Sequence, residues 1–384
     1  MKKKKMKFSI IHVISSLGAG GAENTLYKVA SSLDKRKFDV KVICLSKSGP
    51  ISKKIRSVGI PVYDCNLQNN FFLGFFKLIY LFLKLKPDLT QTWMYHADLL
   101  GGLIAKLTGC KKIVWNIRNT HVFPGQGVSK STYWIMRLNK FLSYNIPDKI
   151  ICVANSAKLS HLKVGYCRKK MLVIHNGFDV DAFKPDSSQK KLTRKFINIE
   201  FKSVLIGCIG RFNFYKNYKN FILAAKVLLS KNPNIFFVLA GKGLDKHNSE
   251  LCDWIDSNDI RSNFRLVGEH FDIPVLMNSL DIFCLPSVSE GFPNVLAEAM
   301  SSGLPCISTN VGDVRYLLTN DKHIVPINNN QLLANSLFKM SELDKAERKK
   351  LGTENRKIIL NEFTIEHMIN KYDHLYEGLL NEKK

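Results

Sequence analysis

The chain alternates short apolar runs with helical patterns along most of its 384 residues. Residues 8–16 and 38–45 have the composition of strands, and residues 23–33 and 51–58, which follow them, have helical spacing. A regular strand–helix order builds a parallel sheet that helices cover on both faces. The sequence therefore predicts an α/β protein whose ligands bind at the carboxyl ends of the strands.

A polar, charged stretch at residues 179–201 interrupts this order, and strand signals then resume. A chain of this length is comfortable for two domains. We therefore expect two facing Rossmann-like domains, residues 1–185 and residues 200–360, with a ligand cleft between them. Residues 361–384 are expected to form a C-terminal helix that packs back on the first domain. The expected strands are residues 112–115, 149–153, 172–175, 203–210, 235–240, 264–267, 282–285 and 305–308.

The chain is strongly basic, with 57 Lys and Arg against 32 Asp and Glu and a formal net charge of +25. Such an excess favours anionic partners, namely nucleotides, anionic lipid surfaces or nucleic acid, although solvated surface lysines are the alternative. No nucleic-acid recognition motif accompanies the charge, so no nucleic-acid partner is expected. Nine cysteines occur singly without a CxxC pair, which fits a reduced cytoplasm.

One aromatic-rich segment, FFLGFFKLIYLFLKL at Phe71–Leu85, raises the question of a membrane. Lys77 and Lys84 interrupt it, and it is too short to span a bilayer. Two interpretations stay open: a core helix with an amphipathic stripe, or a surface that faces an anionic membrane.

A glycine-rich loop, LGAGGAEN at residues 17–24, follows the first expected strand and opens a helix. Gly20 and Gly21 let the backbone turn tightly beside a ligand, and the free N–H groups of a helix start attract anions. The spacing is not GxGxxG, so the dinucleotide fingerprint is absent and a dinucleotide-dependent oxidoreductase is disfavoured.

A second loop, IGRFNFYKN at residues 209–217, follows the first expected strand of the second domain. Arg211 offers a planar fork for phosphate oxygens and Lys216 adds a point charge. Two cations suit a departing diphosphate and could take the place of a metal ion, so no metal site is predicted. The alternative is that both are solvated surface cations.

The third candidate segment is SVSEGFPNVLAEAMSSG at residues 287–303. Pro293 suits a first helical position and Gly303 a C′ position, so a helix is expected over residues 293–302. The N–H groups around its start, at Phe292, Asn294 and Val295, would bind phosphate or sugar oxygens. Glu290 precedes the helix, and Glu298 lies within it, where it could accept from a ribose diol. The alternatives are a helix-dipole partner for Glu290 and an exposed carboxylate for Glu298.

Several motifs in this chain resemble those of the large retaining GT-B glycosyltransferase family called family 4. EGFPNVLAE, from Glu290 to Glu298, looks like its E-x7-E signature, and GRFNFYKN resembles its phosphate loop. Gly241 lies in an AGKG turn and Val267 in an LVG segment that are similar to the family's own. NGFD at residues 176–179 and GGAE at 20–23 also match, and the elements occur in family order across residues 18–313.

The resemblance implies that residues 1–185 form the acceptor side and residues 200–360 the donor side, and it implies a role for each matching position. Arg211 and Lys216 would hold the diphosphate, and Glu298 the ribose hydroxyls. Glu290 would contact the transferred sugar together with the backbone of residues 291–295, which includes Gly291. Gly20, Gly21, Gly241 and Val267 would complete the donor site. No cofactor and no metal are expected.

The chain departs from the resemblance near the reacting sugar. Many family members have a histidine just after the strand at 112–115, where this chain has Arg118 closest to that position and His121 shortly after. His96, which follows another strand, is a further candidate. The catalytic partner of Glu290 from the first domain therefore stays open among these three residues.

The resemblance implies transfer of a hexosyl or N-acetylhexosaminyl unit from a nucleoside diphosphate sugar, expected to be a UDP-sugar, with retention of configuration. Its acceptor would be a glycan or polyprenyl-linked sugar in capsule, O-antigen or lipopolysaccharide synthesis. We accordingly expect a cytoplasmic protein, peripheral on the inner face of the cell membrane. The alternative function is a GT-B-fold nucleotide-sugar epimerase or hydrolase.

Overall fold

The computed structural model describes residues 7–18, 20–120, 122, 128–269 and 272–382. The chain forms two compact units: Met1–Gly177 with Ile365–Lys384, and Phe178–Thr364. The chain thus passes from the first unit to the second between residues 177 and 178, whereas the sequence led us to expect the first domain to end at residue 185. The segment after residue 364 belongs to the first unit.

The first unit contains a sheet of seven parallel strands. Its order is β3-β2-β1-β4-β5-β6-β7, so the strand order reverses between β1 and β4, which are hydrogen-bonded neighbours. Ligands of such sheets bind outside the carboxyl ends of the strands at the point of reversal. The strands are β1 (Phe8–Ile14), β2 (Phe38–Cys44), β3 (Val62–Asp64), β4 (Leu89–Trp93), β5 (Lys112–Ile117), β6 (Lys149–Cys152) and β7 (Met171–Val173).

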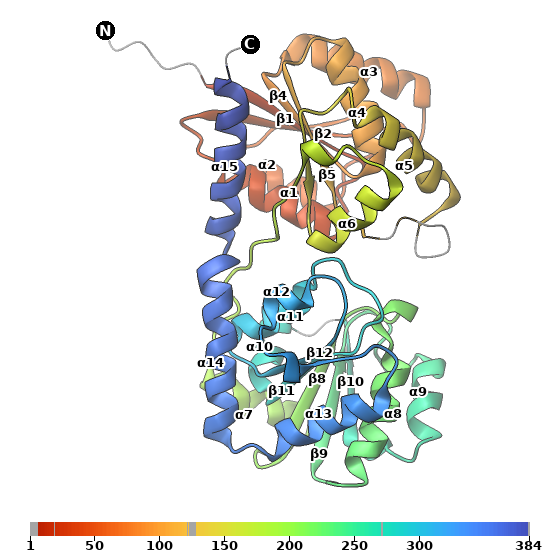
Figure 1. Ribbon diagram of the computed structural model, residues 1–384, viewed down its shortest axis with the longest axis vertical. Helices are drawn as coiled ribbons and strands as arrows, with labels where there is room; N and C mark the ends of the chain where they lie inside the picture. The colour runs from red at the N-terminus through yellow and green to blue at the C-terminus, as the bar shows by residue number, and fades with distance from the viewer. Residues whose placement is uncertain (1–6, 19, 121, 123–127, 270–271, 383–384) are drawn as a thin grey trace. The chain divides into compact units, whose positions relative to one another are not determined.

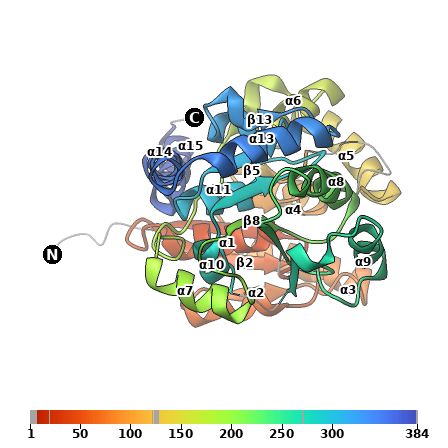
Figure 2. The same cartoon turned by 90° about the horizontal axis from the view of Figure 1, so that it is seen from below.

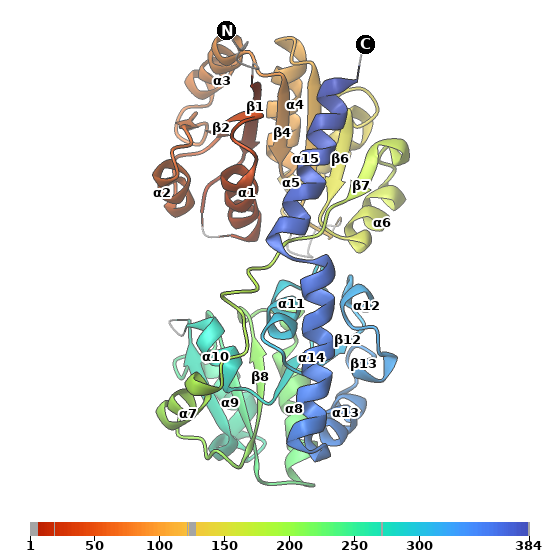
Figure 3. The same cartoon turned by 90° about the vertical axis from the view of Figure 1, so that its left-hand side faces the viewer.

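Helices cover both faces of this sheet (Figures 1 and 3). On one face, the buried side of α1, α2 and α15 packs on β1, β2 and β4 in a single apolar core, to which Tyr372 and Tyr376 of α15 contribute. On the other face, Gly101 of α4 lies so close to Val13 of β1 that an added Cβ would be 2.9 Å from its Cγ1. The helices are α1 (Gly21–Ser32), α2 (Pro50–Ser57), α3 (Phe71–Leu85), α4 (Tyr95–Leu107), α5 (Lys130–Leu142), α6 (Asn155–Val164) and α15 (Ile365–Asn381).

The second unit contains a six-stranded sheet of order β10-β9-β8-β11-β12-β13, also parallel. Here the strand order reverses between β8 and β11. Figure 2 shows α8 and α13 on one side of β8, with α7 and α10 on the other. The strands are β8 (Val204–Ile209), β9 (Ile235–Ala240), β10 (Phe264–Gly268), β11 (Ile282–Leu285), β12 (Cys306–Thr309) and β13 (Ile324–Val325). The helices are α7 (Ser187–Phe196), α8 (Tyr218–Leu229), α9 (Ser249–Asp256), α10 (Ile273–Ser279), α11 (Asn294–Ser301), α12 (Val314–Leu317), α13 (Asn330–Glu342) and α14 (Lys345–Glu362).

The predicted α/β class with two parallel sheets is confirmed. One local expectation is wrong: the polar stretch 179–201, interpreted as a break in regular structure, contains α7. Asp186 caps this helix by accepting from the backbone N–H of Ser188. Arg194 is buried and donates to Asp281 and to the carbonyl of Ser279. Because its buried face is polar and satisfied by distant residues, the helix lacks the apolar stripe by which a sequence is usually assigned.

Candidate active site

Three glycines end neighbouring strands at the carboxyl edge of the second sheet. Gly210 follows β8, Gly241 follows β9 and Gly268 ends β10. The N–H of Gly210 donates to Ala240, and that of Gly241 donates to Gly268 at 2.8 Å. Gly241 has φ +131°, and an added Cβ would lie 2.0 Å from the carbonyl oxygen of Gly210. Only glycine fits there, so this edge presents bare backbone, as a closely approaching ligand requires.

An ion pair joins the two loops at the point of strand reversal. Lys216 Nζ lies 2.7 Å from Glu290 Oε1, and the hydroxyl of Ser287 donates to the same oxygen at 2.8 Å. The Lys216 and Glu290 side chains are only 19% and 15% exposed. The Val288 N–H also donates to the Tyr215 carbonyl, so backbone and side chains both hold the loop after β8 against the loop after β11. A partly buried pair fixed in this way is a preorganised charged site.

The other donor-site candidates of this unit lie at or just beyond the carboxyl ends of its strands or on α11. Arg211 is exposed in the loop after β8, and Val267 is half-buried at the end of β10. Helix α11 begins at Asn294, with Pro293 as its N-cap, one residue later than predicted. Glu298 lies half-buried in this helix.

The Phe292 side chain has a different environment from the one expected for a donor contact. Its ring is 6% exposed and packs against Phe178 and Phe363, with centroids 6.0 and 5.5 Å away. Only its backbone could therefore meet a donor. Its ring anchors the Glu290 loop to the residues at which the chain enters and leaves the second unit, because Phe178 N–H donates to the Phe363 carbonyl at 2.8 Å.

Sequence reasoning missed Gly312 and Asp313, which fix the same loop. The Asp313 N–H donates to the Gly291 carbonyl at 3.0 Å. Gly312 has φ +51°, and a Cβ there would lie 2.3 Å from that carbonyl oxygen and 2.6 Å from that of Glu290. The signal available in the sequence was the VGD tripeptide after an apolar strand, a pattern too common to single out.

In the first unit, the glycine-rich loop leads into α1. Gly20 is the N-cap and Gly21 is the first helical residue. Glu23 is 8% exposed and accepts from the Ser16 hydroxyl at 3.3 Å. This carboxylate, quoted in the GGAE motif but not assigned a role, therefore lies directly against the loop at the end of β1.

Arg118 connects three segments of the first unit. Its Nη2 donates to Thr25 of α1 at 2.9 Å and to the Asn176 side chain at 2.5 Å, and its guanidinium lies 5.8 Å from the Trp93 ring. Burial lowers the pKa of Arg118, while Tyr372 and Glu23 oppose that shift. Its Nη1 is enclosed and has no hydrogen-bond partner among the described residues. Arg118 thus holds the start of α1 and the segment around Asn176 beside the carboxyl end of β4.

His96 lies in the first turn of α4, immediately after the point of strand reversal in the first sheet. It is half-buried, and burial lowers its pKa. Met94, two residues earlier, has φ +72° and ψ 157°, a conformation that is essentially reserved for glycine. Such strain is found where a site dictates the backbone. His121, the remaining candidate, lies outside the described residues.

Comparison with known proteins agrees with this arrangement. Residues 19–182 match the family model for Glycosyltransferase Family 4, and residues 189–358 match that for Glycosyl transferases group 1. The Escherichia coli UDP-Gal:alpha-D-GlcNAc-diphosphoundecaprenol alpha-1,3-galactosyltransferase is 27% identical over 391 residues, which cover 98% of each chain. The Campylobacter jejuni N,N'-diacetylbacillosaminyl-diphospho-undecaprenol alpha-1,3-N-acetylgalactosaminyltransferase is 27% identical, with 72% of this chain and 74% of that protein covered.

Solved structures share the fold. The structure of Anabaena Alr3699/HepE in complex with UDP and glucose has a TM-score of 0.81 at 18% identity, covering 97% of this chain and 100% of that one. TarM has a TM-score of 0.76 at 11% identity, covering 99% and 100%. Two parallel-sheet units, each matched by a glycosyltransferase family model, identify the chain as a glycosyltransferase of the GT-B fold. Within that class, the match of its first half to the Family 4 model and its capsule and O-antigen relatives agree with family 4.

Proposed function

We propose that this enzyme transfers a hexosyl or N-acetylhexosaminyl unit from a UDP-sugar to a glycan or polyprenyl-linked acceptor, with retention of configuration, in surface polysaccharide synthesis. The names of the relatives support the proposal. The E. coli protein uses UDP-Gal and a diphosphoundecaprenol-linked acceptor, and the C. jejuni protein also acts on a diphospho-undecaprenol sugar. A Staphylococcus aureus relative, 24% identical, is named for capsular polysaccharide biosynthesis.

The observation that carries the proposal is the Lys216–Glu290 pair beside the bare glycine edge. The two side-chain hydrogen bonds that described residues donate to Glu290 both reach Oε1, so Oε2 can accept from a hydroxyl of the transferred sugar. Lys216 and the exposed Arg211 supply positive charge for the departing diphosphate, and the N-terminus of α11 adds backbone N–H groups. Glu298, further along α11, would hold the ribose. Charge that develops on the leaving group is thereby stabilised without a metal.

The first test is donor binding and turnover of the full chain with a panel of UDP-, GDP- and ADP-sugars. Lys216→Ala should weaken UDP binding by about tenfold or more, because a charge-assisted contact is lost. Glu298→Ala should also weaken it, whereas Lys226→Ala, an exposed change at the far end of α8, should not. Wild-type affinity and turnover in both Lys216→Ala and Glu298→Ala would place the donor elsewhere.

The same assay separates the alternatives. Transfer requires an acceptor, whereas an epimerase or hydrolase would consume the nucleotide sugar equally fast without one. The anomeric configuration of the product, read by NMR, tests retention. Since two cations can neutralise the diphosphate, we expect activity to persist in EDTA.

We further propose that the first unit attaches to the anionic inner face of the cell membrane. Among the described residues, no helix is both long enough and apolar enough to cross a bilayer. Helix α3 exposes Phe72 by 75% and Phe76 by 64%, and α5 exposes Trp134 by 68%. Helix α4 contacts both α3 and α5, so the helices that carry these side chains are close together in the first unit (Figure 1). Lys77 and Lys84 lie within α3, as suits an anionic interface.

Cosedimentation with phosphatidylglycerol vesicles tests this attachment. Phe72→Ser with Phe76→Ser should reduce binding by about tenfold or more, because each inserted ring contributes about 1.5–3 kcal/mol. Leu192→Ser is the control, because Leu192 is 73% exposed on α7 of the other unit. Equal binding of the double variant and the wild type would rule out α3 as the attachment surface.

A further inference from the structure

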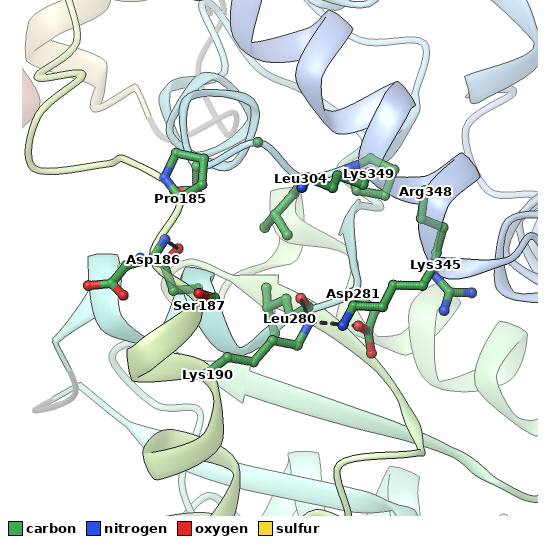
Figure 4. Close-up of a pocket in the computed structure, with 14 residues that line it drawn as sticks. Pro185, Asp186, Ser187, Lys190, Leu280, Asp281, Leu304, Lys345, Arg348 and Lys349 are labelled. Atoms are coloured by element: carbon green, nitrogen blue, oxygen red, sulfur yellow. Dashed lines mark hydrogen bonds and ion pairs between the residues drawn. The ribbon is translucent and has the colours of Figure 1, made fainter.

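A cavity of about 190 Å³ lies at the amino edge of the second sheet (Figure 4). The start of α7, the end of α10, the turn from α11 into β12 and the first turns of α14 line it. Asp281 directly precedes β11 and Pro305 directly precedes β12, whereas Glu290 follows β11. The cavity is therefore at the opposite edge of the sheet from the donor loops and takes no part in the site described above.

Cations dominate the side chains around this cavity. Lys190, Lys345, Arg348 and Lys349 line it, against only two carboxylates, Asp186 and Asp281. Asp281 is already neutralised, since it pairs with Lys190 at 2.7 Å and with Arg194, and it also accepts from the Leu205 N–H.

The other carboxylate is also engaged by its own chain. Asp186 caps α7 by accepting from the backbone N–H and the hydroxyl of Ser188. Positive charge is therefore left in excess around the cavity.

Three of these cations lie at the N-terminus of helix α14, where the helix dipole disfavours positive charge. Lys345, Arg348 and Lys349 are spaced i, i+3 and i+4 at the start of α14, so they share one face. The N-terminus of a helix carries partial positive charge and repels cations. Burial lowers the pKa of Lys190, the pair with Asp281 opposes that shift, and Arg194 and Lys345 add to it. An anion bound here would relieve these repulsions.

The Arg348 guanidinium is already oriented within this group. Its Nη1 donates to the carbonyls of Ser341 and Leu343, at 2.8 and 2.6 Å, which end α13. Among the described residues, no hydrogen bond from its Nη2 is found. An arginine held through one nitrogen can offer another to an oxyanion without a further loss of side-chain freedom.

Part of the cavity lining is apolar and is called the apolar floor here. It consists of Pro185, Leu280, Leu304 and Pro305 (Figure 4 labels the first three). Gly303, in the same lining, has φ +72°, and a Cβ there would lie 3.0 Å from Pro185 Cγ, so any larger residue would narrow the space. The cavity thus combines a cationic rim with a floor suited to a carbon skeleton.

We propose that this cavity is a second ligand site, which binds a phosphate ester with the phosphate at Lys345, Arg348 and Lys349 and the carbon portion on the apolar floor. The proposal does not depend on the identity of the donor or acceptor. The phosphate group can come from a free phosphorylated metabolite or from a phospholipid headgroup, and the experiment distinguishes the two.

Glycerol 3-phosphate is the probe for the free ligand, measured by thermal shift and calorimetric titration on the full chain. Lys345→Gln with Lys349→Gln should weaken its binding by about tenfold or more. The matched control is Lys350→Gln with Lys357→Gln, two exposed lysines of the same helix outside the lining, which should bind like the wild type. Circular dichroism and thermal unfolding of all variants verify that they are folded.

The donor edge is also cationic, so Lys216→Ala is measured in parallel. Retained glycerol 3-phosphate binding in Lys216→Ala, with loss in the Lys345/Lys349 variant, supports the cavity. Loss in Lys216→Ala alone, or equal binding by all variants, overturns the proposal. Vesicles of phosphatidylcholine with and without phosphatidic acid then assign the source. Binding to phosphatidic acid that depends on Lys345 and Lys349 indicates a headgroup, and glycerol 3-phosphate binding without it indicates a free metabolite.

Discussion

At the scale of single residues, the first unit uses a buried cation as a structural connector. Arg118 binds Thr25 and Asn176 from segments far from it in the sequence, and it lies over Trp93. Histidine, expected at this position from the family resemblance, has a shorter side chain and at most two donors. The guanidinium can bridge both acceptors from one nitrogen, so its substitution should be felt in stability as well as in catalysis.

Arg118→Met tests that assignment. The substitution removes the two hydrogen bonds that Arg118 donates to Thr25 and Asn176. We expect this loss to lower the free energy of unfolding, measured by urea titration, by about 1.5–3 kcal/mol. The affinity for UDP should not change, because the donor loops belong to the second unit. Arg36→Met, which removes an exposed pair with Asp34, is the control and should have little effect. A fully stable Arg118→Met protein without activity would instead assign Arg118 to the chemistry alone.

At the scale of elements, α14 packs on the turn after α11 with almost no separation. A Cβ on Gly352 of α14 would lie 1.8 Å from the carbonyl oxygen of Gly303. Asn355, also on α14, donates to the Leu304 carbonyl at 2.8 Å. The helix that carries Glu298 is thus held at its carboxyl end by a helix from late in the chain.

The Gly352→Ala substitution separates helix propensity from packing. Alanine is favoured over glycine in a helix by about 1 kcal/mol. The clash at Gly352 is with backbone, so separating the helices should cost about 1–3 kcal/mol and outweigh that gain. Gly378→Ala in α15 is the matched control, since a Cβ there meets nothing within 4 Å, and it should stabilise the protein. Stabilisation by both substitutions, measured by thermal unfolding, would contradict the close packing of α14.

At the scale of the whole molecule, the chain builds the first unit from both of its ends. After the second unit is complete, α15 returns to the first, where Tyr372 and Tyr376 are fully buried. The Asn116 side chain donates to the Tyr372 hydroxyl, and Tyr376 donates to Gln91. Folding of the first unit therefore requires residues that are synthesised last, and its stability is a property of the entire chain.

Two buried histidines make this stability sensitive to acid. Burial lowers the pKa of His12 from 6.5 to about 3 and that of His161 from 6.5 to about 4. In the unfolded chain both take up protons near pH 6.5, while in the folded unit they stay neutral to lower pH. Between these limits the unfolded state binds more protons, so the free energy of unfolding falls as pH falls.

We expect each histidine to contribute a slope of about 1.4 kcal/mol per pH unit between pH 6 and its folded pKa. Urea unfolding across this range measures it. His12→Gln should flatten the dependence relative to the wild type, whatever its effect at neutral pH. Parallel pH profiles for His12→Gln and wild type would show that His12 is not the titrating group.

The sequence by itself determined the elements whose signals are local. The bounds of β9 and β11 were predicted to the residue, because an apolar run ends where its own residues change character. The two-sheet architecture followed from the strand–helix order, and the loops at the carboxyl edges followed from the glycines and charges that end the strands.

Only the tertiary structure decided which side chains meet. The Lys216–Glu290 pair, the bonds from Arg118 to Thr25 and Asn176, and the burial of the Phe292 ring among aromatic residues each join segments far apart in the chain. Helix α7 forms within a polar stretch because Asp281, remote in sequence, neutralises its buried arginine. Side-chain direction depends on what the folded chain brings alongside, and no local period in a sequence carries that information.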